Sequence, residues 1–208
     1  MKKYNIIGFA GGTASGKTTL ASKLFNYYGE NNSIIINQDS YYKDQSILSH
    51  EERTIINYDH PDAIDIKLLS NNLKALINGK IINKPFYDHK THTRDINFDA
   101  VYPKKIIIVE GTLVFHFKQL TDLMSLKIFI HSSEKTRFKR RIERDIIDRG
   151  RTSSSVHKQY IDTVYPMHQK FIEPTRSFAD IEISGEENIK TVTKKIISLI
   201  NSTINKEN

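Results

Sequence analysis

Short apolar runs, rich in isoleucine and valine, alternate along the chain with longer amphipathic stretches. The apolar runs are Tyr4–Ala10, Ser33–Asn37, Lys105–Val109, Leu126–Ile130 and Ala179–Ile183. A strand with one face in water alternates apolar and polar residues, whereas a strand buried on both faces of a parallel sheet is apolar throughout. The pattern therefore predicts five central strands of a parallel sheet.

The amphipathic stretches lie between these runs and have helical periodicity. They cover Lys17–Tyr28, Asp65–Asn78, Glu134–Asp148, Ser153–Phe171 and Asn188–Ile204. Strands that alternate with helices are typical of an α/β fold. Residues 80–102 break the alternation with turn residues, aromatic residues and two histidines, and we predict a β-ribbon insertion there. A chain of 208 residues is expected to form one domain, 1–208, that carries this insertion.

The amino-acid composition limits which partners and which kinds of site the protein can have. The chain has 31 Lys+Arg against 24 Asp+Glu, a net charge of +7, which favours nucleotides, nucleic acid or acidic membrane surfaces as partners. It has no cysteine, which excludes disulfide scaffolds, thiolate metal sites and a cysteine nucleophile. The first apolar run is shorter than the ~7–15 residues of a secretory core, and no run reaches the ~18 residues of a membrane span. We therefore expect a cytoplasmic protein.

A glycine-rich loop joins the first predicted strand to the first predicted helix. Its sequence is Gly11-Gly12-Thr13-Ala14-Ser15-Gly16-Lys17-Thr18-Thr19, which contains the pattern G-x-x-x-x-G-K-[ST]. In such loops the glycines let backbone N–H groups surround phosphate oxygens, and the following helix adds its positive N-terminal end. Lys17 is expected to reach the β- and γ-phosphates, and the Thr18 hydroxyl to bind Mg²⁺.

Two acidic residues follow other predicted strands. Asp39 comes shortly after the second strand and Glu110 directly after the third. Because ligands of open α/β sheets bind at the carboxyl ends of the strands, both acids are expected in the same crevice as the loop. Glu110 suits a ligand of Mg²⁺ or of its water, and Asp39 suits the acceptor of a proton from an attacking hydroxyl. The alternative for each is a helix cap or turn residue, since Ser40 and Gly111 follow them.

The predicted helix at 134–148 and the turn after it are rich in arginine. The arginines are Arg137, Arg140, Arg141, Arg144, Arg149 and Arg151, and the acids near them are Glu143, Asp145 and Asp148. Arg137, Arg141 and Arg144 share one helix face because they are spaced by four and three residues. Spacing alone leaves two interpretations open: a solvated face with ion pairs to the nearby acids, or a basic lid at about 134–160 that closes over polyphosphate.

Several further segments are distinctive when they are taken together with the loop. They are Asp39-Ser40-Tyr41-Tyr42, Asn57-Tyr58-Asp59-His60-Pro61-Asp62-Ala63, Pro85-Phe86-Tyr87-Asp88 with His92 and Arg94, Glu110-Gly111, Arg141–Arg151, Gln159-Tyr160 and Pro166–Thr175. In this order they resemble the uridine kinase (uridine–cytidine kinase) family over nearly the whole chain. The glycine-rich loop is shared by many NTPase families, whereas the NYDHPDA, PFYDHKTHTR and RDIIDRGR segments are far more specific.

The resemblance implies a P-loop NTPase three-layer fold with a β-ribbon insertion and a helical lid. It also implies a kinase that transfers the γ-phosphate of ATP or GTP, with Mg²⁺, to the 5′-hydroxyl of uridine or cytidine. The product would be UMP or CMP in pyrimidine salvage. The expected assembly is a homotetramer, with no nucleic-acid and no membrane partner.

The resemblance also implies roles for individual residues. Asp39 falls on the position of the catalytic base, and Lys17 and Arg144 on positions that act on the transferring phosphate. Tyr42, Asp59, Tyr87, His92, Arg141, Arg144, Arg151 and Gln159 fall on nucleoside- or phosphate-binding positions, and Thr18 and Glu110 on the metal side. One carboxylate such as Asp59 can accept hydrogen bonds from both ribose hydroxyls. His92 can donate or accept depending on its tautomer, which suits both uracil and cytosine.

The chain departs from the family pattern at three places, none of them at the transferring centre. Thr112 stands where isoleucine is frequent, and His131 where an acid often closes the fourth strand. Residues 184–188 read SGEEN, without the second glycine that usually precedes the nucleotide base. The donor preference between ATP and GTP therefore stays open.

Two other functions compete with this interpretation. Another P-loop small-molecule kinase, such as a pantothenate kinase or a phosphoribulokinase, would share the core but not Asp59, Tyr87 and His92 in their motifs. A nucleic-acid-binding ATPase would explain the net charge of +7. However, the chain shows no separate recognition module, and a lid accounts for the arginines.

Overall fold

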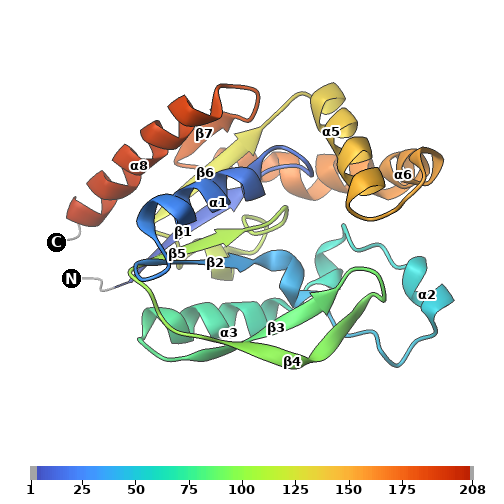
Figure 1. Cartoon of the computed structure of the whole chain (residues 1–208), viewed down its shortest axis with the longest axis horizontal. Helices are drawn as coiled ribbons and strands as arrows, with labels where there is room; N and C mark the ends of the chain where they lie inside the picture. Colours follow the sequence, from blue (N-terminus) through green and yellow to red (C-terminus); the bar gives the residue numbers. More distant parts are fainter. Residues whose placement is uncertain (1–3, 207–208) are drawn as a thin grey trace.

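The computed structural model describes residues 4–206 and places a parallel sheet of five strands at its centre (Figure 1). The strands are β1 (Asn5–Ala10), β2 (Ser33–Asn37), β5 (Ile106–Glu110), β6 (Leu126–His131) and β7 (Ile181–Ser184). Their order across the sheet is β2-β5-β1-β6-β7, and every neighbouring pair is parallel. The predicted α/β fold with a parallel sheet is therefore confirmed, and each strand lies within two residues of its predicted bounds.

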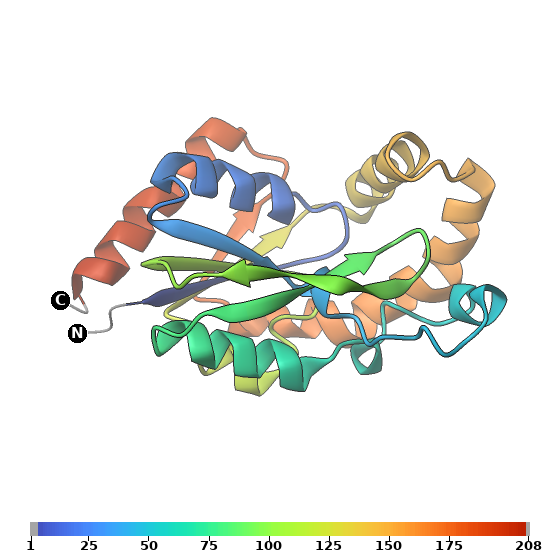
Figure 2. The ribbon, with the colours of Figure 1, turned by 60° about the horizontal axis from the view of Figure 1, so that its bottom comes forward.

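Both faces of the sheet are covered, which explains the unbroken apolar runs. On β1, Ile6 and Ala10 belong to the core beneath α3 (Ile66–Ile77), whereas Ile7 and Phe9 belong to the opposite core. Helices α1 (Lys17–Tyr28) and α8 (Ile189–Lys206) cover that second core. Figures 1 and 2 show these helices on one side of the sheet and α3 on the other. Successive side chains of a central strand thus enter two different cores.

The remaining helical segments are short, apart from α5. They are α2 (His50–Thr54), α4 (Lys118–Thr121), α5 (Glu134–Ile147), α6 (Ser153–Gln159) and α7 (Tyr165–Met167), with 3₁₀ turns at Gln38–Tyr41, Pro61–Ala63 and Glu173–Phe178. Helix α2 was not predicted, although a capping box marks it. The Ser49 side chain accepts from the backbone N–H of Glu52 at 3.2 Å, and the Glu52 carboxylate accepts from the Ser49 N–H at 2.8 Å.

The long helix predicted over 153–171 is present, but it is not α-helical throughout. Its backbone widens into π-helix at Tyr160–Val164 and again at His168–Ile172. Pro166 lies between these two segments. Proline has no N–H to donate to the residue four positions earlier and its ring crowds the preceding turn, so a regular α-helix cannot run through it undisturbed.

The segment that interrupts the strand–helix alternation forms an antiparallel ribbon of β3 (Ile82–Asp88) and β4 (Thr93–Val101). The ribbon lies beside α3 in Figure 1. Both terminal nitrogens of Arg94 lie 3.2 Å from the Asp65 carboxylate, and one also donates to the Tyr41 carbonyl at 3.3 Å. Asp65 itself caps the start of α3. The ribbon is therefore fastened to the core where its tip reaches the carboxyl edge of the sheet.

The carboxyl ends of the strands point toward α5, α6, α2 and the tip of the ribbon, while both ends of the described chain lie at the opposite edge (Figures 1 and 2). The edge with the strand ends is where a ligand of an open α/β sheet is expected. Within residues 4–206, no helix is both long and apolar enough to span a membrane.

Candidate active site

The glycine-rich loop links β1 to α1 in a conformation that its glycines make accessible. Gly11 and Gly16 have φ angles of +143° and +107°, in the region that favours glycine. A Cβ on Gly11 would lie 2.1 Å from the carbonyl oxygen of Ile130, so a side chain there would displace β6. Ala14 also has a positive φ, +56°, which residues other than glycine rarely adopt. The loop is therefore tightly wound against the sheet.

Lys17 bends back over this loop. Its Nζ donates a hydrogen bond to the Gly12 carbonyl at 2.9 Å, and its side chain is almost fully buried. Burial lowers the pKa of Lys17 to about 8, while the charges of Glu110 and Asp39 act in the opposite direction. The ammonium therefore stays mainly charged at neutral pH and faces a space that two acids share.

Thr18 and Glu110 meet across the end of β5. The Thr18 hydroxyl donates to Glu110 Oε1 at 3.1 Å. Burial raises the pKa of Glu110, and Lys17 opposes that shift. These are hard oxygen donors of the kind that Mg²⁺ prefers, and Mg²⁺ usually takes one or two protein oxygens together with water and substrate phosphates. Accordingly, residues 4–206 contain no cluster of three or more His, Cys, Asp or Glu side chains that could hold a metal alone. The pair fits a Mg²⁺ site that phosphate would complete.

Asp39 lies in the 3₁₀ turn directly after β2, and its carboxylate faces the same space as Lys17. Its neighbour Gln38 is buried and fixes this arrangement. Gln38 Oε1 accepts a hydrogen bond from the Leu113 N–H at 2.9 Å, and its side chain fills the space that a Cβ on Gly111 would need. Gln38 thus ties the end of β2 to the segment after β5. Sequence reasoning did not single it out, although it lies next to the predicted base.

Aromatic rings line one part of the cleft at this edge of the sheet. The Tyr42 ring lies 5.1 Å from that of Tyr87 and 5.4 Å from that of Tyr58. The His92 ring stacks on Tyr58 at 4.7 Å with an angle of 11° between the planes. His92 has a φ of +56°, and burial lowers its pKa, so it is neutral at pH 7. Flat walls of this kind suit a planar heterocycle.

Asp59 lies in the wall of the same cleft. Burial raises the pKa of its carboxyl group, and the nearby Arg141 guanidinium lowers it. In the described part of the chain the carboxylate forms no ion pair and accepts no hydrogen bond; only the Asp59 backbone N–H is bonded, to Asn57. A half-buried carboxylate with free acceptor capacity is able to bind hydroxyl groups.

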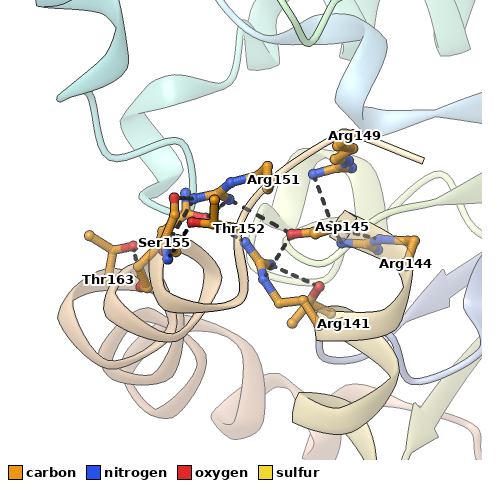
Figure 3. Close-up of polar contacts among 10 residues, drawn as sticks. Arg141, Arg144, Asp145, Arg149, Arg151, Thr152, Ser155 and Thr163 are labelled. Carbon is orange, nitrogen blue, oxygen red and sulfur yellow. Dashed lines mark hydrogen bonds and ion pairs between the residues drawn. The ribbon is translucent and has the colours of Figure 1, made fainter. Parts of the chain in front are cut away.

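Arginines of α5 and of the turn before α6 lie close together (Figure 3), and they line the cleft. Arg141 Nη1 donates to the hydroxyl of Thr13, in the glycine-rich loop, at 3.0 Å, and Nη2 donates to Gln159 Oε1 at 2.9 Å. Arg151 Nη1 donates to the same Gln159 oxygen. Arg141 is almost fully buried, so the solvated-face interpretation fails for it. Arg137 is buried as well, but it packs against Gly12 and donates to the Ser132 carbonyl outside the cleft.

One continuous cleft of about 1640 Å³ joins these features. Its walls include the predicted residues Thr13, Ala14, Gly16, Lys17, Thr18, Thr19, Asp39, Tyr42, Asp59, Tyr87, His92, Glu110, Arg141, Arg144, Arg151 and Gln159. Gly11, Gly12 and Ser15 are absent from the walls because they form the buried underside of the loop. Tyr58, His89 and Arg149 also line it. Sequence reasoning did not assign Tyr58 and His89 to the site, although both lie inside its most specific segments.

Comparison with known proteins agrees with this geometry. The family model described as "Phosphoribulokinase / Uridine kinase family" matches residues 6–192. The chain belongs to this family. The uridine kinase of Halalkalibacterium halodurans is 48% identical over 203 residues, covering 96% of each chain, and that of Clostridium perfringens is 44% identical over 206 residues, covering 99% of each. The resemblance to the uridine kinase family is thereby confirmed.

Solved structures of the phosphoribulokinase / uridine kinase family show the same architecture. Phosphoribulokinase from Rhodobacter spheroides superposes with a TM-score of 0.66 over 88% of this chain and 71% of that chain, at 17% sequence identity. At that identity the likeness concerns the fold alone. It confirms the P-loop kinase fold and leaves the substrate to the residues of the cleft.

The lowered pKa of Lys17 makes anion binding depend on pH. Above pH 8 the free protein loses the Lys17 proton, and a bound polyphosphate favours its return, so affinity should fall as pH rises through about 8. We expect ADP binding to take up about half a proton at pH 8 and nearly one at pH 9. Calorimetry in buffers of different ionisation enthalpy measures this uptake. Lys17→Met should abolish it, and an uptake near zero in the unmodified protein at both pH values would contradict the assignment.

Proposed function

We propose that this protein is a uridine/cytidine kinase that transfers the γ-phosphate of ATP or GTP to the nucleoside 5′-hydroxyl, yielding UMP or CMP in pyrimidine salvage. The observation that carries the proposal is the single cleft of about 1640 Å³ whose walls contain the loop with Lys17, Asp39, the aromatic rings and Asp59. That volume has room for a polyphosphate together with a nucleoside. The two curated relatives named "Uridine kinase" match this chain over 96% and 99% of its length, which supports the same assignment.

The residues around the phosphate donor would bind its charged phosphates and fix their position. Phosphoryl transfer passes through a loose transition state, in which positioning and charge stabilisation supply most of the acceleration. Loop N–H groups and Lys17 would bind the β- and γ-phosphates, and Arg141, Arg144 and Arg151 would face the charge that develops on the transferring group. Thr18 and Glu110 would hold Mg²⁺, which would supply positive charge to offset that of the donor phosphates.

The acceptor end would align the hydroxyl for attack. Asp39 would accept a hydrogen bond from the 5′-hydroxyl and orient its lone pair toward the γ-phosphorus. As the new O5′–P bond forms, the bond from phosphorus to the bridging oxygen of the donor breaks, and the hydroxyl proton passes to the Asp39 carboxylate. A carboxylate is a weak base toward an alcohol, so the main role of Asp39 would be to orient the hydroxyl before the new bond forms.

The aromatic end would select the nucleoside. Tyr42, Tyr58 and Tyr87 would enclose a single-ring base, and the neutral His92 would donate or accept at its edge, which matches the O4 acceptor of uracil and the amino donor of cytosine. Asp59 would accept from the 2′- and 3′-hydroxyls of the ribose. A purine exceeds this space by a whole ring.

We also propose that the protein works in the cytoplasm as a homotetramer. Phe86 and Phe98 on the β3–β4 ribbon and Tyr102 directly after it are each more than half exposed, and this apolar surface is available to a protein interface. Light scattering should give four times the chain mass of 24.1 kDa. Phe98→Glu should lower that mass, because a buried carboxylate would destabilise the interface. A monomer for the unmodified protein would contradict the proposal.

The role of Asp59 gives a test of the nucleoside site. Binding desolvates its carboxylate, and 2′-deoxyuridine lacks one of the two donors that would satisfy it. Sites built to bind a hydroxyl can reject analogues that lack it by up to ~10⁴. Because this cleft is open to water, which can replace the missing donor, we expect kcat/KM for deoxyuridine to be lower by at least roughly tenfold, or ~1.4 kcal/mol.

The matched variant is Asp59→Ala. It should damage uridine turnover far more than deoxyuridine turnover and so narrow the gap between them. Steady-state kinetics with both nucleosides measures the two ratios. Equal kcat/KM for the two substrates in the unmodified protein, or an unchanged ratio in the variant, would show that Asp59 does not bind the ribose.

A further inference from the structure

One buried carboxylate lies at the centre of the arginine cluster. Asp145, on α5, is fully excluded from solvent and does not line the cleft. Its oxygens lie 3.5 Å from Arg141 Nε, 2.7 Å from Arg144 Nη2, 3.7 Å from Arg149 Nη1 and 3.8 Å from Arg151 Nη1 (Figure 3). Four cations thus share one anion, and a net charge of 4 − 1 = +3 remains in the cluster.

The four contacts differ in kind. Arg144 donates from both Nε, at 2.9 Å, and Nη2, at 2.7 Å, to the same oxygen, Oδ1. The other three guanidinium groups lie within ion-pair distance but beyond a normal hydrogen bond. The second oxygen, Oδ2, is buried and accepts no hydrogen bond from any residue in 4–206. Asp145 therefore binds Arg144 through hydrogen bonds and attracts the other three guanidinium groups through its charge.

Each arginine also connects Asp145 to a part of the cleft. Arg141 continues to Thr13 in the loop, and Arg144 and Arg149 line the cleft itself. The backbone N–H of Arg151 donates to the Asp145 carbonyl at 3.1 Å, so the turn after α5 folds back onto the same residue. Burying an ion costs several kcal/mol unless its partners compensate. The buried Asp145 carboxylate therefore depends on its arginine partners, and it in turn fixes where their guanidinium groups lie.

We propose that Asp145 is a positioning residue for phosphoryl transfer: it holds the guanidinium groups of Arg141, Arg144, Arg149 and Arg151 in the arrangement that receives the transferring phosphate. The proposal rests on the kinase function proposed above. Asp145 touches no substrate and acts through the arginines. Without its charge, the four cations would repel one another and their long side chains would regain rotamers. Preorganised charge is worth more than charge that must be assembled during the reaction.

The first test is Asp145→Asn, which retains the shape of the side chain and removes its charge. A displacement of about 1 Å at reacting groups can cost ~10² in rate, so we expect kcat to fall by about 10- to 100-fold. The KM for uridine should stay within about twofold, since most nucleoside contacts lie on other elements. The control is Asp162→Asn. Asp162 is an exposed carboxylate in the π-helical segment Tyr160–Val164, paired with Lys158 at 2.6 Å, and its variant should keep the unmodified kcat.

The second test is Asp145→Glu, which separates positioning from simple charge balance. Glutamate restores the buried negative charge, and therefore part of the stability, but it displaces the carboxylate oxygens by one methylene. Because the extra methylene must fit a fully buried position, we expect a melting temperature below that of the unmodified protein but above that of Asp145→Asn, together with a kcat still at least about fivefold lower. Unmodified kcat in this variant would overturn the proposal. Should Asp145→Asn fail to fold, this variant alone decides.

A double variant tests whether Asp145 acts through Arg144. If it does, Asp145→Asn should cost less kcat in an Arg144→Lys background than in the unmodified protein, because the two hydrogen bonds from Nε and Nη2 to Oδ1 are already lost. Losses that multiply independently would contradict the coupling. An unmodified protein that phosphorylates no nucleoside would refute the proposed function instead, so the two failures are distinguishable.

Discussion

Lys17, Arg137 and Arg141 carry three positive charges that are at most 6% exposed, all at the carboxyl edge of the sheet. Burial on this scale is costly, as the lowered pKa values of Lys17 and Arg141 show. The charges persist because backbone carbonyls and a few oxygen-bearing side chains accept their hydrogen bonds, and because Asp145 offers a buried counter-charge. These contacts tie the glycine-rich loop to α5 and to the end of β6. The interactions that offset the cost of burying these cations are therefore the ones that gather positive charge at this edge of the sheet.

The parallel sheet provides the platform on which this site is built. Its strands end together, so Glu110 and Asp39 reach the same space from β5 and from the turn after β2, and Gln38 locks those two segments to each other. The ribbon and α5 come from different parts of the chain and lie on two sides of the carboxyl edge of the sheet (Figures 1 and 2). Residues of both elements line the cleft. A rigid base with two appended walls suits a reaction that must align two substrates and exclude water between them.

Much of this could be predicted from the sequence, because the deciding signals are local. Unbroken apolar runs revealed the strands, and the glycine spacing revealed the loop. Burial is not a local property, so the sequence could not separate the buried Asp145 from the two other acids near the arginines of this helix. For the same reason it placed Arg137 on one helix face with Arg141, although Arg137 lies outside the cleft. The π-helical turns on either side of Pro166 depend on tertiary packing, which the spacing of apolar residues along the sequence does not show. Tyr58 could not be assigned to the site from the sequence, because its ring stacks on His92, which is distant in the chain.

The central claim is that one cleft phosphorylates a pyrimidine ribonucleoside at its 5′-hydroxyl. The most direct measurement is an assay of the purified protein with Mg²⁺-ATP and a panel of nucleosides, in which the 5′-monophosphate product is quantified. The account predicts UMP from uridine and CMP from cytidine. Adenosine should be discriminated against by more than the ~10–200-fold that one methylene provides, because a purine adds a whole ring. A kcat/KM for adenosine comparable to that for uridine, or ATP hydrolysis that responds to added RNA or DNA but yields no nucleoside monophosphate, would contradict it.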